Sequence, residues 1–206
     1  ENENLLAVGR QVEKKNWITL LNAFIRFKNT ATGSNLKLIF IGDGPLHKQL
    51  VKIADNRQDI IFQKFVQQSE LVDYYQSAKG LVLPSFYGET WGLVVNEAMA
   101  AGLPVLVSEE CGCADTLIKD SVNGWTFNPH NIENMIHVIR KLDNLTQSQF
   151  EQMSQASTQI INEWGLSRFS QGVFDSLAYI IQRHKKKKFW LAIILSTFWD
   201  GRYRPV

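Results

Sequence analysis

Residues 80–108 read GLVLPSFYGETWGLVVNEAMAAGLPVLVS, two apolar runs on either side of a helix-like segment. The runs at 80–84 and 103–108 are almost continuously apolar, which is typical of parallel strands buried on both faces. Between them, residues 92–101 suit a helix, with Gly102 as its C-cap and Pro104 opening the next strand. The stretch therefore predicts a strand–helix–strand unit with parallel strands.

The same alternation continues on both sides of this unit. Further strands are expected at 5–9, 36–42, 59–63 and 123–127, and helices at 16–31, 45–54, 69–78, 114–118, 131–143, 146–163 and 167–183. Buried strands separated by helices predict a doubly wound, Rossmann-like α/β domain, with a parallel sheet and helices on both faces.

Composition excludes several other classes of protein. The chain is 45% hydrophobic and 20% charged, with a net charge of +2, which suits a globular protein with a sizeable core. No stretch of the body resembles a nucleic-acid surface. Cys111 and Cys113 are too close for a disulfide and too few for a zinc site, so a reducing, cytoplasmic compartment is expected. The histidines show no metal-ligand spacing, and no metal site is expected.

The chain is expected to be an excerpt of a longer polypeptide, because it starts at Glu1 rather than Met and enters a strand at once. Residues 1–184 are predicted to form the folded domain, and residues 185–206 a basic, apolar tail of net charge +5. Its 11-residue apolar run, 189–199, is too short to span a bilayer. Peripheral contact with anionic lipid at the inner face of a membrane, and packing on a missing domain, stay open as alternatives.

Ligands of doubly wound folds bind beyond the carboxyl ends of the strands. The loops expected to share this rim are 9–16, 42–45, 64–68, 84–92 and 108–114. Arg10, Lys14 and Lys15 in the first loop could bind phosphate, although a solvated basic loop would look the same. Gly42 and Gly44 permit close backbone approach to a ligand, or simply a tight turn.

The segment around Glu89 and Glu97 carries a more specific signal. The helix beginning near Gly92 would present unpaired backbone N–H groups to a phosphate. Glu97 would point back toward that helix start, where a carboxylate can accept from both hydroxyls of a ribose. Its neighbours are apolar, and a carboxylate there needs a partner. The alternative is that Glu89 and Glu97 are ordinary helix-start and surface charges.

Three segments together resemble the carboxyl-terminal domain of the glycosyl transferases group 1 family. They are VGRQVEKKN (8–16), IGDGPLHKQL (41–50) and ETWGLVVNEAMAAGLPV (89–105), and the resemblance extends from about residue 5 to 180. Gly9, Arg10 and Lys15 match the G-R…K phosphate motif, and Glu89 and Glu97 match the E-x7-E motif. The family consists of retaining, nucleotide-sugar-dependent enzymes of the GT-B fold.

The resemblance implies a role for each matching residue. Arg10 and Lys15 would hold the donor diphosphate, Glu97 the ribose and Glu89 the transferred sugar. Leaving-group stabilisation by these cations would make a divalent ion unnecessary. The base loop would contribute Phe65 and Val66. The remaining donor-binding positions are Gly9, Gly42, Thr90, Trp91, Gly92 and Leu93.

The sequence departs from the family pattern at three places, namely Asn16 and Lys64 where glycine is usual and Trp91 where phenylalanine is usual. Lys64 puts the details of base recognition in doubt. The acceptor-binding, amino-terminal half of a GT-B enzyme is absent from the sequence, so the chain is expected to bind a nucleotide sugar without transferring it. The acceptor would be a glycan or a lipid-linked molecule, in polysaccharide or glycoconjugate biosynthesis.

Two other functions remain open. The same residues would suit a non-catalytic nucleotide-sugar-binding module. An unrelated Rossmann-type enzyme using a dinucleotide is disfavoured, because no G-x-G-x-x-G follows the first strand.

Overall fold

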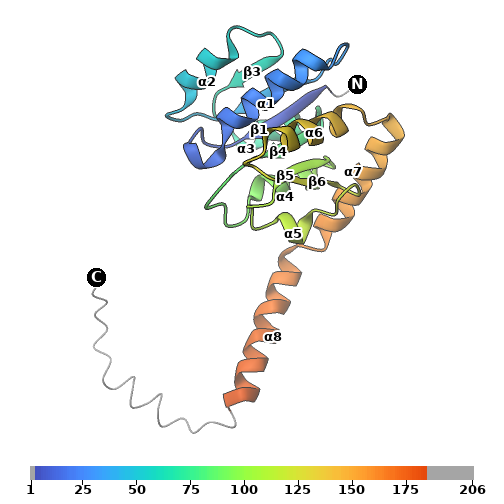
Figure 1. Ribbon diagram of the computed structural model, residues 1–206. Coiled ribbons are helices and arrows are strands. Elements are labelled where there is room, and N and C mark those ends of the chain that lie inside the picture. Colours follow the sequence, from blue (N-terminus) through green and yellow to red (C-terminus); the bar gives the residue numbers. More distant parts are fainter. Residues whose placement is uncertain (1–2, 185–206) are drawn as a thin grey trace, which may run out of the picture. The chain divides into compact units, whose positions relative to one another are not determined.

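The computed structural model describes residues 3–184 and divides the chain into two compact units, Glu1–Asn162 and Glu163–Val206. Figure 1 shows the first unit as a sheet covered by helices. The predicted tail at 185–206 lies outside the described residues. The predicted boundary between domain and tail at 184/185 is therefore not tested.

The core of the first unit is a six-stranded, wholly parallel sheet in the order β3-β2-β1-β4-β5-β6. This order places the topological switch point between β1 and β4. All six strands lie where the apolar runs predicted them. They are β1 (Asn4–Val8), β2 (Lys37–Ile41), β3 (Ile60–Gln63), β4 (Ala78–Leu83), β5 (Val105–Ser108) and β6 (Gly124–Phe127).

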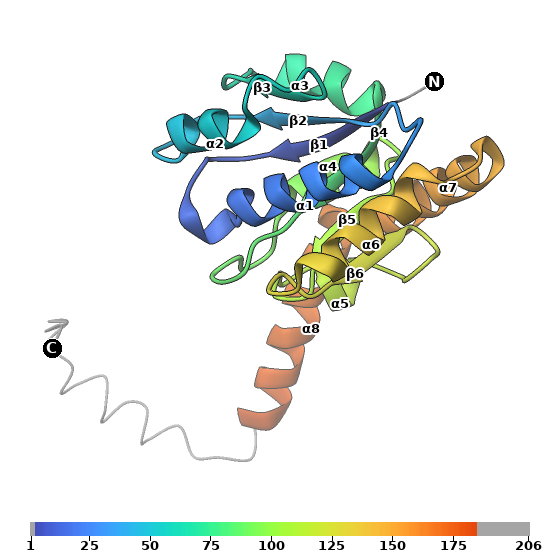
Figure 2. The same cartoon turned by 45° about the horizontal axis from the view of Figure 1, so that its top comes forward.

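Helices cover both faces of the sheet, as predicted. On one face, α1, α2 and α6 pack over a shared apolar core, and Figure 2 shows α1 and α6 side by side across it. On the other face, α3 and α4 contact the central strands, and α7 packs on α4. The helices of this unit are α1 (Trp17–Thr30), α2 (His47–Ala54), α3 (Gln68–Gln76), α4 (Leu93–Ala100), α5 (Ala114–Leu117), α6 (Ile132–Asp143) and α7 (Gln147–Asn162), with a 3-10 turn at Glu13–Lys15.

Helix α1 shows how the apolar pattern builds the core. Trp17, Phe24 and Phe27 on its buried face are fully inaccessible to solvent. Burying a side chain of this size stabilises the fold by about 1.5–3 kcal/mol. The Trp17 ring packs edge-on against Phe40 of β2 at 5.8 Å, and its indole N–H donates to the Arg10 carbonyl at 3.0 Å. The core therefore holds the loop that follows β1 in place.

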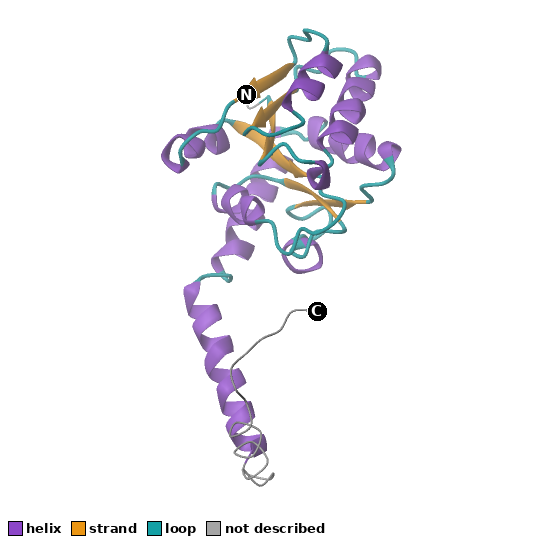
Figure 3. Ribbon diagram, turned by 90° about the vertical axis from the view of Figure 1, so that its left-hand side faces the viewer, coloured by secondary structure: helices purple, strands orange, loops and turns teal. Residues whose placement is uncertain are grey.

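The described part of the second unit is the helix α8 (Leu166–His184) and the residues leading into it, drawn with the other helices in Figure 3. It carries large apolar side chains that are exposed, among them Leu166, Phe169 and Phe174. None of the helices within residues 3–184 combines the length and apolarity needed to cross a membrane.

The rim loops after β1 and β2 touch each other directly. Gly42 has a φ of +126°, and a Cβ built on it would lie 2.4 Å from the carbonyl oxygen of Gly9. Gln11, a buried residue that the sequence did not single out, donates to the Gly42 carbonyl at 2.9 Å and bonds to the His47 Nδ1 at 2.9 Å. The absence of a side chain at Gly42 is thus explained by loop packing, and its predicted contact with a ligand stays a prediction.

Substituting Gly42 with alanine is expected to lower the free energy of unfolding by about 3 kcal/mol, because the methyl group meets backbone in a strained conformation. Gly33 is a matched control, since its φ is also positive, +87°, but nothing lies within 4 Å of its Cβ position. Gly33→Ala is expected to cost about 1 kcal/mol. Urea unfolding measures both, and equal losses would show that the close approach of the loops is not required.

Candidate functional site

The switch point brings two predicted rim loops together at the carboxyl ends of β1 and β4. The backbone N–H of Phe86 donates to the Lys14 carbonyl at 3.1 Å. In return, the Lys14 ammonium donates to the carbonyl of Gly88 at 3.2 Å. Two segments that are 74 residues apart in sequence at the second contact are therefore joined on the same rim.

The central contact between these loops is an ion pair. The Lys15 ammonium binds Oε2 of Glu89, and the two side chains are only 14% and 13% exposed. The hydroxyl of Ser85, at the end of β4, donates to the same oxygen at 3.1 Å and is fully buried. A pair with so little solvent is screened less by salt than a surface pair. The residues predicted to bind phosphate and sugar thus neutralise each other.

Arg10 lies beside this pair but forms no ion pair within the described part of the chain. Its side chain is exposed and lines an open cavity of about 560 Å³. The other lining residues are Val12, Glu13, Lys14, Lys15 and Tyr87. Lys15 is paired with Glu89, so Arg10 and Lys14 against Glu13 leave the cavity wall with a small net positive charge, as an anion-binding surface requires.

The second carboxylate, Glu97, lies one turn inside α4 and has a partner from another helix. The hydroxyl of Tyr75 in α3 donates to Glu97 Oε2 at 2.9 Å. Burial, and then the negative charge of Glu97, raise the pKa of Tyr75 well above its usual range, so its hydroxyl stays protonated. The apolar setting of Glu97 correctly predicted that it needs a partner, but no sequence spacing pointed to Tyr75.

The start of α4 is open on the site side. Gly92 precedes the helix with a φ of +103°, and the first helical bond runs from the Val95 N–H to the Gly92 carbonyl at 2.8 Å. The N–H groups ahead of that bond have no acceptor within the helix. The indole N–H of Trp91 donates to Asn96 Oδ1 at 2.9 Å, which holds the ring along the helix. Thr90 and Leu93 are exposed at the same place.

The loop after β5 is hydrogen-bonded to the segment that contains Glu89 and Trp91. The N–H of Gly112 donates to the Glu89 carbonyl at 3.0 Å, and the N–H of Cys113 donates to the Trp91 carbonyl at 3.3 Å. A Cβ at Gly112 would lie 2.0 Å from the Thr90 carbonyl oxygen, so only glycine allows this approach. The contacts of this loop are therefore accounted for by packing against the segment that carries Glu89.

Cys111 and Cys113 are buried free thiols, as their spacing predicted. Burial raises the pKa of Cys111 to about 12 and the pKa of Cys113 to about 11. A thiol is nucleophilic as its thiolate, and these thiols stay protonated at neutral pH. They serve as small apolar groups beneath the rim.

The predicted base loop lies on the same rim but farther from the ion pair. It follows β3, the edge strand, and is joined to the loop after β2 by a hydrogen bond from the Gly42 N–H to the Gln63 carbonyl at 3.0 Å. Phe65 is 73% exposed and Val66 is partly buried. Within residues 3–184, neither Phe65 nor Val66 forms a hydrogen bond or an ion pair with Arg10 or Glu89.

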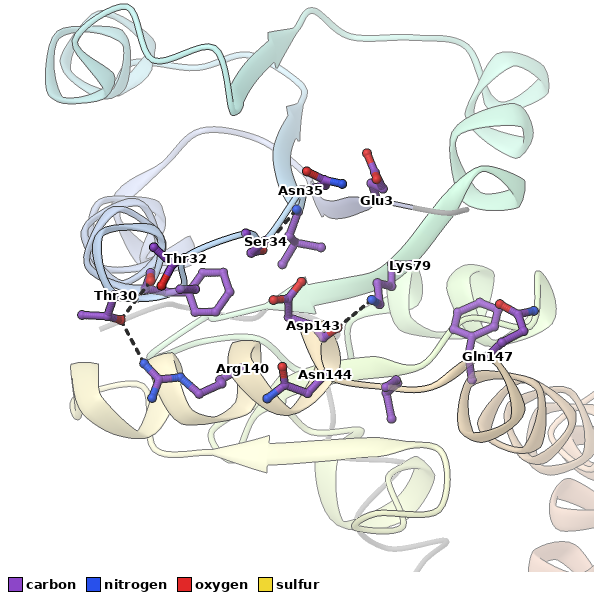
Figure 4. Close-up of a pocket in the computed structure, with 16 residues that line it drawn as sticks. Glu3, Thr30, Thr32, Ser34, Asn35, Lys79, Arg140, Asp143, Asn144 and Gln147 are labelled. Atoms are coloured by element: carbon purple, nitrogen blue, oxygen red, sulfur yellow. Dashed lines mark hydrogen bonds between the residues drawn. The ribbon is translucent and has the colours of Figure 1, made fainter.

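A second, larger cavity of about 880 Å³ lies at the opposite edge of the sheet (Figure 4). It is lined by Glu3, Leu36 and Lys79, which lie at the amino ends of β1, β2 and β4. Its Lys79 ammonium already donates to the Asp143 carbonyl at 2.8 Å, and its Arg140 guanidinium donates to the Thr30 hydroxyl at 2.9 Å. Despite its size, this cavity holds none of the predicted site residues.

No cluster of three or more His, Cys, Asp or Glu side chains suited to a metal ion occurs in residues 3–184. The candidate site therefore consists of side-chain cations, two partnered carboxylates and a helix start. Such a set can bind a ligand that carries both anionic groups and hydroxyls.

The fold and the site define a Rossmann-like domain with an anion- and hydroxyl-binding rim at its switch point. The chain belongs to the glycosyl transferases group 1 family, whose model matches residues 1–159. This confirms the predicted family.

Individual relatives agree with this membership. The chain is 37% identical over 108 residues to the sulfoquinovosyl transferase SQD2 of Arabidopsis thaliana, covering 52% of this chain and 21% of that protein. It is 32% identical over 138 residues to the alpha-monoglucosyldiacylglycerol synthase of Acholeplasma laidlawii, covering 65% of this chain and 34% of that protein. The chain thus spans about a third or less of the length of these relatives.

A solved structure shows the same fold. A mutant of S. aureus TarM in complex with fondaparinux, alpha-GlcNAc-glycerol and UDP superposes with a TM-score of 0.74 at 20% identity, covering 84% of this chain and 35% of that chain. The structural neighbours are glycosyltransferases of the GT-B class, as the sequence predicted.

We expect the partly buried ion pair to stabilise the fold through a coupling of about 2 kcal/mol between Lys15 and Glu89, because either charge is costly when left alone. Urea unfolding of Lys15→Met, Glu89→Gln and the double variant measures this coupling. The matched control is the exposed pair Arg26–Glu133, whose side chains are 52% and 65% accessible. Its coupling is expected to be below about 0.5 kcal/mol. Similar couplings for both pairs would contradict the special role of the Lys15–Glu89 contact.

Proposed function

We propose that this chain is the donor-binding half of a retaining glycosyltransferase, which moves a sugar from a nucleotide-diphospho-sugar to a glycan or lipid-linked acceptor. Polysaccharide or glycoconjugate biosynthesis is the proposed setting. The observation that carries the proposal is the contact between Lys15 and Glu89, because it unites the phosphate motif and the E-x7-E motif in one place.

The geometry suggests how donor binding would proceed. A diphosphate entering the cavity beside Arg10 would attract the Lys15 ammonium away from Glu89. The Glu89 carboxylate would then be free to accept hydrogen bonds from hydroxyls of the sugar. One ion pair would be exchanged for another, so the partly buried ammonium would keep a counter-charge throughout.

The same groups would assist the reaction. As the bond between sugar and phosphate breaks, negative charge builds on the nucleoside diphosphate. Arg10, Lys15 and the open N–H groups at the start of α4 would stabilise that charge. We propose that these groups take the part of a divalent cation, so that no metal is needed. The retaining outcome is proposed from the E-x7-E pair, Glu89 and Glu97.

Acceptor binding would require further partners. The chain corresponds to a fraction of its relatives' length, and the acceptor site is proposed to lie in an amino-terminal domain of the same protein. One relative is named for a diacylglycerol product, which supports including lipids among the acceptors to be tested.

The chain is expected to bind UDP or GDP with a dissociation constant of about 0.1–1 mM, to bind NAD more weakly, and to transfer no sugar by itself. Calorimetric titration measures the binding, and a turnover assay with nucleotide sugars tests for transfer. Lys15→Met is expected to weaken binding about tenfold, through loss of a charge-assisted contact.

Lys37→Met is the matched control, because Lys37 is exposed at the amino end of β2. Equal effects of the two substitutions, or tighter binding of NAD, would overturn the proposed donor site. Robust sugar transfer by the 206 residues would overturn the proposed need for a second domain.

Peripheral membrane contact is proposed for residues 185–206, on the basis of their net charge of +5 and their apolar run. Binding to vesicles that contain anionic lipid is expected to be lost on deletion of these residues, and to weaken at high salt. Vesicles of neutral lipid are the control in co-sedimentation. Unchanged sedimentation after the deletion would favour packing of the tail on a missing domain.

A further inference from the structure

The hydrogen bond between Tyr75 and Glu97 joins two successive helices that are separated in the chain by β4. Tyr75 is on α3, ahead of β4, and Glu97 is on α4, beyond β4. The phenol hydroxyl approaches Glu97 Oε2 at 2.9 Å, and the tyrosine is 4% exposed. The ring therefore packs on the face of the sheet that α3 and α4 cover, and its hydroxyl points toward Glu97.

Within residues 3–184, the Glu97 side chain accepts a hydrogen bond from Tyr75 and from no other residue. The neighbouring Asn96 is taken by the Trp91 indole. A carboxylate can accept about four hydrogen bonds, two at each oxygen. Oε2 is thus oriented by the protein, while Oε1 is left for a ligand.

The hydroxyl is a permanent donor in this setting. Burial keeps the pKa of Tyr75 above its usual range, so the phenol remains protonated wherever Glu97 is ionised. A fixed donor restricts the rotamers of a glutamate that would otherwise swing freely, and less entropy is then lost when a ligand binds. This argument concerns orientation of the carboxylate rather than direct contact with the ligand.

We propose that Tyr75 is a positioning residue that orients the Glu97 carboxylate for the vicinal hydroxyls of a ribose, and so makes the site select ribonucleoside over 2′-deoxyribonucleoside diphosphates. The proposal rests on the proposed function, which assigns the ribose to Glu97. Tyr75 acts through Glu97 and touches neither the sugar nor the phosphates.

The test compares UDP with 2′-deoxy-UDP, and GDP with 2′-deoxy-GDP, by calorimetric titration of the full chain. Tyr75→Phe keeps the buried ring and removes the hydroxyl. We expect it to weaken binding of the ribonucleotide about five- to tenfold, because the glutamate rotamers that it frees must then be immobilised on binding, and to weaken binding of the deoxynucleotide less. A merely structural role would weaken both forms equally.

Tyr74→Phe is the matched control, because Tyr74 is the adjacent residue on α3. Within residues 3–184, its hydroxyl forms no hydrogen bond. It is expected to leave both affinities unchanged. Glu97→Gln separates the two levels of the argument. If Glu97→Gln abolishes the preference for ribose but Tyr75→Phe does not, the positioning role fails and the proposed donor site stands. If Glu97→Gln leaves the preference intact, the ribose assignment itself fails.

A measurement without nucleotide checks the contact directly. A double-mutant cycle of Tyr75→Phe and Glu97→Gln in thermal unfolding is expected to show coupling, with the double variant less destabilised than the two single shifts together imply. Additive shifts would show that the hydrogen bond is absent in solution and would overturn the proposal. Absence of nucleotide binding altogether would overturn the proposed function, and the role of Tyr75 with it.

Discussion

Burial of the sheet on both faces is the constraint on which the rest of this structure depends. Parallel strands need long crossovers, and the crossovers here are helices that cover the two faces in turn. Every strand then runs in the same direction, so all the strands end at one edge. Where the winding reverses between β1 and β4, the chain leaves the two strands toward opposite faces of the sheet, and ligands of doubly wound folds bind at this point. The position of the site is a consequence of how the chain buries its apolar segments.

The candidate site also depends on the charged and polar partners of the carboxylates at that edge. Glu89 and Glu97 are separated by seven residues, yet their surroundings differ. Glu89 lies in a loop, where its carboxylate is paired with the Lys15 ammonium and accepts a hydrogen bond from the Ser85 hydroxyl. Glu97 lies on a helix and is held by the neutral hydroxyl of Tyr75. The first carboxylate is paired with a cation, whereas the second accepts from a neutral donor. Two residues of the same type are thereby suited to two tasks, as their environments decide.

Much of this arrangement could be predicted. The strands and helices followed from apolar runs and their spacing, because burial on both faces leaves a strong and local signal. Arg10, Lys15, Glu89 and Glu97 were predicted as site residues chiefly because they match the motifs of the family that the sequence resembles. The partners of these residues could not be predicted. Ser85, Tyr75 and Gln11 carry no distinguishing pattern, and Gly42 was interpreted as a ligand-binding position although packing alone explains its lack of a side chain.

The sequence by itself determined the class of fold, the order of its elements and the edge at which ligands of this class of fold bind, because these depend on local periodicity and on general rules of chain connection. Only the tertiary structure decided which charge neutralises which, and which hydroxyl holds which carboxylate. Those contacts join segments 22 and 74 residues apart. Their formation depends on the register of packed helices and strands to within an ångström, and no pattern along the chain encodes that distance.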